Sequence, residues 1–128
     1  RRAASSRFGQ KYGFEKIANY ADFASAVPLQ SWSTLKPYAE AMVHGESNQL
    51  FAGDPDYFVC TSGTTSAIKM MPESAQGRAV KSLTTQLRVE AMLRHASTMM
   101  DEKILPLVNN ATEGYTEHGV AFGSASGI

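Results

Sequence analysis

Hydroxyl side chains, a glycine and a lysine gather in one short segment of the chain. Five hydroxyl residues surround the glycine, and the lysine follows after two apolar positions: Thr61, Ser62, Gly63, Thr64, Thr65, Ser66 and Lys69. A bound polyphosphate needs hydroxyl and backbone N–H donors, a glycine where the backbone comes close to it, and a cation that offsets its charge. The segment supplies all three and therefore predicts a phosphate-binding loop.

The spacing within this segment excludes one common type of phosphate loop. A Walker loop requires a glycine directly before the lysine and a serine or threonine directly after it. Here Ile68 and Met70 flank Lys69, so the Walker motif is absent. Loops rich in serine and threonine also occur where hydroxyl groups satisfy turns and helix caps by local hydrogen bonds. Composition alone leaves both a phosphate site and an ordinary polar loop open.

Two apolar elements flank the loop and would position it. The run Tyr57–Cys60 has the length and residue types of a strand. Residues 74–100 have apolar side chains at helical steps and predict the longest helix. A strand, a donor-rich loop and a helix in succession form a common phosphate site, to which the helix N-terminus adds its positive end. We expect the methionines Met92, Met99 and Met100 to pack in a core rather than line a ligand pocket.

The string Thr61–Thr65, a few residues before Lys69, resembles the phosphate-binding loop of the adenylate-forming superfamily, which includes acyl-CoA synthetases and luciferases. Flanking motifs narrow the resemblance to the acyl-acid amido synthetases, the auxin-responsive enzymes of plants and their bacterial relatives. These motifs are Val27-Pro28-Leu29, Leu35-Lys36-Pro37-Tyr38, Gly45-Glu46, Lys69-Met70-Met71-Pro72 and, more weakly, Gly123–Ser126. One departure is Ser66-Ala67, where many superfamily members have a glycine after the second threonine.

The resemblance implies an α/β fold, the N-terminal part of an adenylate-forming large domain with an incomplete sheet. It implies a ligase that uses ATP and Mg²⁺ to adenylate a small carboxylic acid and then transfers the acyl group to an amino acid amine. The loop residues, with Lys69, would hold the β- and γ-phosphates. We expect the chain to be a fragment that is inactive alone and needs the remainder of its own chain as partner. An acyl-CoA ligase and a non-enzymatic module that binds a nucleotide or a partner remain the alternatives.

The remaining sequence divides into parts around the loop. Residues 1–30 are an aromatic and basic lead-in, 31–55 a helix and turn, 56–72 the strand and phosphate loop, and 73–128 a helix, strand and loop. The helix begins after Ser31 or Ser33, carries Pro37 in its first turn and ends at Gly45. Short strands are predicted at Gln49–Phe51 and Ile104–Val108, and a loop at residues 109–119.

Composition excludes several classes of protein and partner. The 128 residues leave room for one domain at most, and 12 basic against 12 acidic side chains give no general attraction for nucleic acid or anionic lipid. No apolar run approaches the roughly 20 residues of a membrane-spanning helix. We expect a cytoplasmic protein with no nucleic-acid, membrane or metal site, whose lead-in aromatic residues pack in a core or on a neighbouring domain. Cys60 is expected to be buried and inert, and His44, His95 and His118 to be non-catalytic.

Overall fold

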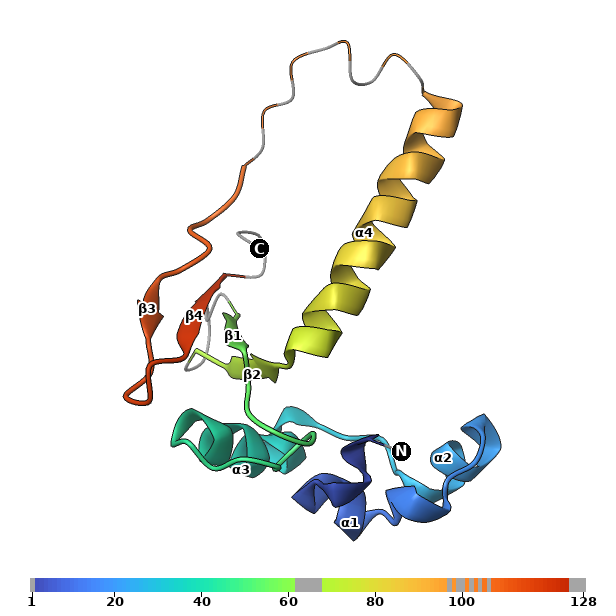
Figure 1. The fold of residues 1–128 in the computed structure, drawn as a ribbon, viewed down its shortest axis with the longest axis vertical. Helices are drawn as coiled ribbons and strands as arrows, with labels where there is room; N and C mark the ends of the chain where they lie inside the picture. The colour runs from blue at the N-terminus through green and yellow to red at the C-terminus, as the bar shows by residue number, and fades with distance from the viewer. Residues whose placement is uncertain are drawn as a thin grey trace.

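Helices form the first part of the chain, and a small sheet and one long helix follow (Figure 1). The computed structural model describes residues 2–61, 68–96, 98, 101, 103, 105 and 107–124. With η for a 3-10 helix, the elements are η1 (Arg2–Ser5), α1 (Arg7–Lys11), η2 (Phe14–Lys16), α2 (Tyr20–Ala26), α3 (Trp32–Val43), β1 (Tyr57–Cys60), β2 (Met70–Glu73), α4 (Ala75–His95), β3 (Gly114–Tyr115) and β4 (Ala121–Ser124). None of the described helices combines the length and apolar composition needed to span a bilayer.

The aromatic residues of the lead-in pack around Phe8, which is buried. Its ring centroid lies 4.7 Å from that of Tyr12 and 5.6 Å from that of Tyr38 on α3. Phe14 meets Phe8 edge-on at 5.9 Å and lies 6.0 Å from Phe23. Tilted and edge-to-face pairs of this kind stabilise beyond the area that they bury. The cluster joins the lead-in to α3, and the packing predicted for these aromatic residues is confirmed for Phe8.

The strand predicted at residues 49–51 is wrong, because the chain forms a loop there. The carbonyl oxygens of Asn48 and Gln49 accept hydrogen bonds from the N–H groups of Arg7 and Phe8, at 2.7 and 2.9 Å. The first N–H groups of a helix have no partner within that helix. The N-terminus of α1 therefore takes the carbonyl groups that a strand ladder would have used.

Helix α3 begins after Ser31 and ends at Val43, immediately before the predicted stop. Its buried side chains are Ala39 and Met42. The prediction that Pro37 occupies the first turn is wrong, because a helix that begins at Trp32 places it in the second. Proline has no N–H to donate to the carbonyl group four residues earlier, so the helix lacks one internal hydrogen bond there.

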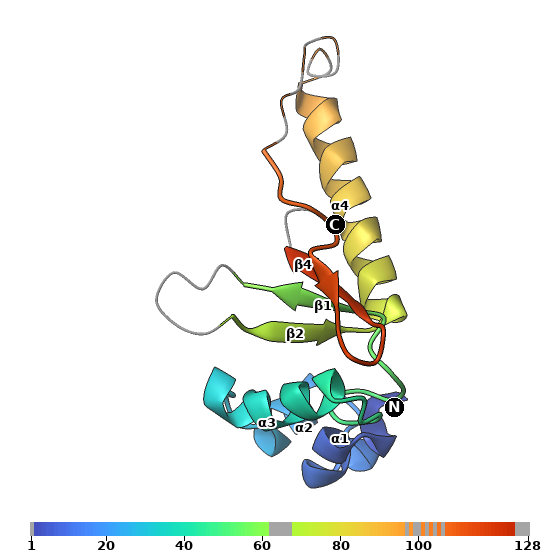
Figure 2. The same cartoon turned by 90° about the vertical axis from the view of Figure 1, so that its left-hand side faces the viewer.

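The four strands form one open sheet in the order β2-β1-β4-β3. Strand β1 pairs antiparallel with β2 and parallel with β4, and β3 pairs antiparallel with β4. Phe58 at the centre is fully buried and lies opposite Pro72 on one side and Phe122 on the other. Figure 2 shows β1 beside β2, with α3 next to β2. The predicted α/β class with an incomplete sheet is confirmed.

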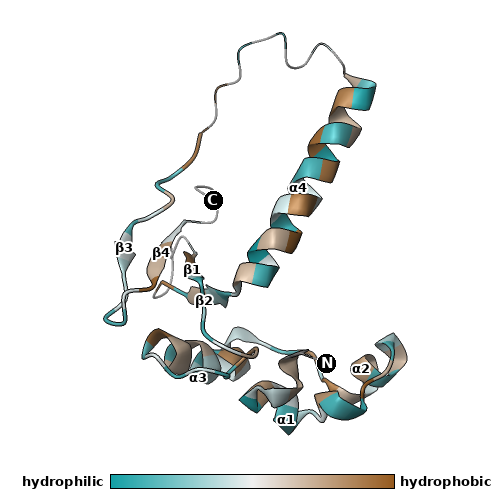
Figure 3. Cartoon of the chain, in the orientation of Figure 1, coloured by the Kyte–Doolittle hydropathy of each residue, from teal (hydrophilic) through white to brown (hydrophobic). Residues whose placement is uncertain are grey.

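Helix α4 begins where predicted, with the Ser74 hydroxyl oxygen accepting a hydrogen bond from the Gly77 N–H at 3.1 Å. It ends at His95, before the predicted end at residue 100. The helix rises away from the sheet (Figure 1), and apolar and polar residues alternate around it (Figure 3). None of its described side chains is buried, so the core packing predicted for Met92 is wrong. Met99 and Met100 lie outside the described residues.

The segment after α4 returns to the sheet, and the described residues of the strand predicted at 104–108 do not form a strand. Its described apolar residues Leu105, Leu107 and Val108 are exposed and pair with no strand. Ile104 and Pro106 lie outside the described residues. Strand β3 falls instead within residues 109–119, which were predicted to be a loop, and its two residues pair with β4. A two-residue strand carries too little periodicity to be recognised in a sequence.

Candidate functional site

The end of the β1–β2 hairpin brings together the first and last residues of the predicted phosphate-binding set. Cys60 lies opposite Met70 in the ladder, and the Thr61 N–H donates to the Lys69 carbonyl oxygen at 3.1 Å. The backbones of Thr61 and Lys69 are therefore neighbours, although eight positions separate them in sequence. The other predicted members, Ser62, Gly63, Thr64, Thr65 and Ser66, lie outside the described residues.

The side chain of Lys69 lies against α3. Its Nζ is 5.8 Å from the centroid of the Trp32 ring, within the range of a cation–π interaction. Both residues line a groove of about 470 Å³ between α3 and the start of β2. The remaining lining residues are Ser33, Lys36, Glu40, Val43, His44, Ile68 and Met70. The sequence predicted Lys69 as a site residue but gave no signal for Trp32, which belongs to a different element.

Within the described part of the chain, Lys69 forms no ion pair with a carboxylate. The neighbouring cation of the groove, Lys36, lies 3.4 Å from the carboxylate of Glu40, one helical turn along α3. The charge of Lys36 is therefore partly balanced, whereas the partner that the described residues give Lys69 is an uncharged ring. An ammonium group in this state can take an anionic ligand without first breaking an ion pair.

The N-terminus of α4 lies at the opposite end of the hairpin from Thr61 and Lys69. Tyr57 pairs with Glu73, and Ser74 caps the helix directly after that pair. Three residue steps along the strand correspond to about 10 Å. The prediction that the helix follows the loop directly and adds its positive end to the site is therefore wrong: β2 intervenes and carries the chain away from the loop.

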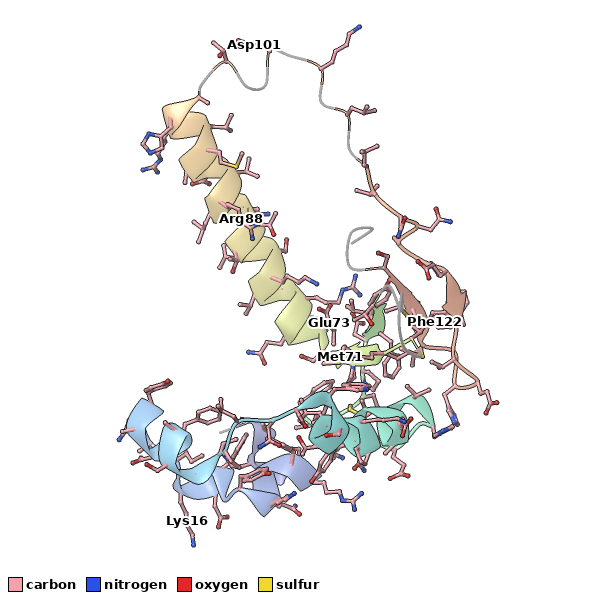
Figure 4. All side chains as sticks on the ribbon, turned by 180° about the vertical axis from the view of Figure 1, so that it is seen from behind. Lys16, Met71, Glu73, Arg88, Asp101 and Phe122 are labelled. Atoms are coloured by element: carbon pink, nitrogen blue, oxygen red, sulfur yellow. The ribbon has the colours of Figure 1, made fainter. Side chains whose placement is uncertain are left out.

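A second group of charged residues lies at this opposite end, which we call the foot of α4 (residues 56, 57, 73, 78 and 81). Arg78 Nη1 lies 2.6 Å from Asp56 Oδ2, and Lys81 Nζ lies 2.9 Å from Glu73 Oε1. The Arg78 guanidinium also lies 5.3 Å from the ring centroid of Tyr57. Figure 4 shows Glu73 beside the start of α4, away from Phe122. Sequence analysis missed these pairs, which join the helix to residues in and before the strands.

The two cations at the foot of α4 are matched by two carboxylates, so this group has no net positive charge that would attract an anion. A cavity of about 770 Å³ adjoins it, lined mainly by the same ion pairs and by small or polar side chains of α4. Exposed ion pairs contribute about 0–1 kcal/mol each, and their geometry ties α4 to the hairpin. The foot of α4 is therefore a structural junction, and Lys69 is the better candidate for anion binding.

Cys60 lies one residue before the loop and is half-buried. Burial, and to a smaller extent the charge of Glu113, raise the pKa of its thiol above the ordinary value. A thiol with a raised pKa stays protonated at neutral pH and is a poor nucleophile. The predicted inertness of Cys60 agrees with this environment.

The three histidines are exposed and belong to different settings. His44 caps the C-terminus of α3, His95 ends α4, and the ring of His118 lies against Gly45. Among the described residues, no three His, Cys, Asp or Glu side chains lie close enough together to hold a metal ion.

Comparison with known proteins identifies the chain at the level of its family. No curated protein gives a significant match. The family model described as the GH3 family N-terminal domain matches residues 1–128. This range includes the phosphate-loop string and every flanking motif on which the sequence resemblance rested, and it confirms that prediction. The chain belongs to the GH3 family, that of the auxin-responsive acyl-acid amido synthetases, and the model that it matches describes the N-terminal domain of that family.

Proposed function

We propose that this chain supplies the phosphate-binding part of an ATP-dependent acyl-acid amido synthetase. The observation that carries the proposal is the hairpin end, where a backbone hydrogen bond of 3.1 Å joins Thr61 to Lys69. Membership of the GH3 family and the unpaired charge of Lys69 among the described residues support it. Residues 62–66 keep their predicted role as further donors.

The proposed reaction has two steps. A carboxylate oxygen attacks the α-phosphorus of ATP, the bond to the bridging oxygen of the β-phosphate breaks, and pyrophosphate leaves. The amine of an amino acid then attacks the acyl carbon, AMP leaves, and the amine releases a proton as the amide forms. Negative charge grows on the pyrophosphate during the first step, so a fixed ammonium and hydroxyl donors there stabilise the transition state.

The role of Lys69 in this scheme is electrostatic. Its ammonium would offset charge on the β- and γ-phosphates, and Thr61, whose backbone is paired with that of Lys69, would supply a further donor. Magnesium would accompany ATP and offset part of the charge of its phosphates.

Calorimetric titration with Mg·ATP, inorganic pyrophosphate and AMP tests the proposal. We expect Lys69→Ala to weaken the binding of ATP and pyrophosphate about 10- to 100-fold, because a charge-assisted hydrogen bond is lost, and to leave AMP binding unchanged. The matched control is Lys16→Ala, which removes one positive charge at the far end of the helical region (Figure 4). A folded wild-type chain that binds none of these ligands, or equal losses in both variants, would contradict the proposal.

A further inference from the structure

The ring of Trp32 lies beside the ammonium group of Lys69. Trp32 is the single tryptophan of the chain, lies at the first position of α3, and has its ring 5.8 Å from the Lys69 Nζ. Indole is the aromatic ring that attracts a cation most strongly. Helix α3, which carries the ring, is anchored because its residues Ala39 and Met42 are buried.

The backbone of Lys69 is fixed as well, through its carbonyl group, by the hydrogen bond from Thr61. Its side chain is a flexible stem of four carbons, so the ammonium can move while the backbone stays in place. No described carboxylate forms an ion pair with this ammonium, because Glu40 in the same groove pairs with Lys36. The indole face is thus the interaction that the structure provides for it in the absence of an anion.

We propose that Trp32 is a positioning residue for Lys69: its ring holds the ammonium while no phosphate is bound and releases it when phosphate arrives at the hairpin end. This inference rests on the proposed function for the release step, but not for the contact itself. A charge-assisted hydrogen bond to phosphate is stronger than a cation–π interaction at a half-exposed site, so phosphate wins the competition. The ring and the phosphate therefore compete for the ammonium. The ring lowers the affinity for phosphate by the same factor by which it favours the ring-bound position of the lysine.

The contact can be tested without any ligand, because Trp32 is the one tryptophan of the chain and therefore gives all of its tryptophan fluorescence. A positive charge above the indole alters the energy of its excited state, so Lys69→Met is expected to shift the emission of the free chain. Lys36→Met is the matched control, since Lys36 lines the same groove but pairs with Glu40. Equal spectra for wild type and Lys69→Met, or equal shifts in both variants, would overturn the contact.

Release is tested by titrating the wild-type chain with pyrophosphate and with Mg·ATP. The emission is expected to move toward that of Lys69→Met as either ligand saturates the chain. Trp32→Leu is expected to tighten binding about two- to fivefold in the wild-type background and to have no effect in the Lys69→Met background. Trp32→Phe keeps an aromatic face and should give an intermediate affinity, which separates loss of the ring interaction from damage to α3.

Three outcomes overturn the release step. They are weaker binding by Trp32→Leu, the same effect of Trp32→Leu with or without Lys69, and binding that leaves the emission unchanged. If the wild-type chain binds neither ligand, the proposed function and the release step fail together. The comparison of Lys69→Met with Lys36→Met in the free chain still decides whether Trp32 holds Lys69, so the two failures are distinguishable.

Discussion

The two ends of the β1–β2 hairpin hold their cations in opposite ways. At the foot of α4, Arg78 and Lys81 each lie within 3 Å of a carboxylate, at 2.6 and 2.9 Å. At the loop end, Lys69 lies over an uncharged ring. A cation matched by a carboxylate joins two elements, whereas one held by an aromatic face keeps its charge for a ligand. Within one hairpin, the partner of each cation therefore distinguishes a structural junction from a candidate binding site.

The largest effect is expected from Phe58→Ala, which should break both ends of the hairpin. Phe58 is fully buried between Pro72 and Phe122 in the register, and truncating such a side chain leaves a cavity. We expect a loss of about 3–5 kcal/mol in the free energy of unfolding, measured by urea denaturation. Phe23→Ala, at a 42% exposed position, is the control and should cost less. Similar losses in the two variants would show that the hairpin is not the stabilising centre.

A smaller effect, confined to one end, is expected from Ser74→Ala. The substitution removes the hydroxyl that caps α4 and should cost about 1 kcal/mol in the free energy of unfolding, whereas Ser74→Thr should keep most of the cap. Affinity for Mg·ATP should not change, because the helix N-terminus lies at the foot and not at the loop. A loss of ATP affinity as large as that expected for Lys69→Ala would show that the N-terminus of α4 contributes to the binding site.

The smallest effect is expected in the titration of Cys60, at the loop end. Because its pKa is raised, the folded chain holds the thiol proton more tightly than the unfolded chain does. The resulting stability is present below the ordinary thiol pKa and is lost as pH rises through the folded value.

We therefore expect alkylation of Cys60 by iodoacetamide to show a pH midpoint above the ordinary thiol value of about 8.5. Glu113→Gln should lower this midpoint slightly. Lys69→Met should leave it unchanged, because the ammonium lies over Trp32. A lower midpoint in the wild-type chain than in Lys69→Met would indicate that the ammonium lies near the thiol instead.

Local patterns in the sequence were sufficient to predict several elements. Strand β1, the cap of α3, the start of α4 and the stop after α3 all follow from residues within a few positions of each other. Strand β2 was missed because its four residues include Pro72, which a sheet tolerates only at an edge, and β2 is the edge strand. The return segment was misread as a strand because its apolar residues lack a partner in the described structure.

The candidate site was only partly predictable for the same reason. Thr61 and Lys69 were predicted as site residues because their residue types and spacing belong to one short segment, and the structure pairs their backbones. Trp32 was missed because the contact with Lys69 depends on how α3 packs beside β2, and no local pattern encodes that packing. The ion pairs of Arg78 with Asp56 and of Lys81 with Glu73 likewise depend on a hairpin that the sequence did not predict.

Strand β1 has two neighbours that become available at different stages of folding. Strand β2 needs only the closure of the short connection between Cys60 and Met70, whereas β4 must wait until all of α4 and the return segment have been brought back. Closing a longer loop costs more entropy, and pairings distant in sequence form more slowly. The hairpin is therefore expected to assemble first and to present one side of β1 as the template on which β4 later docks.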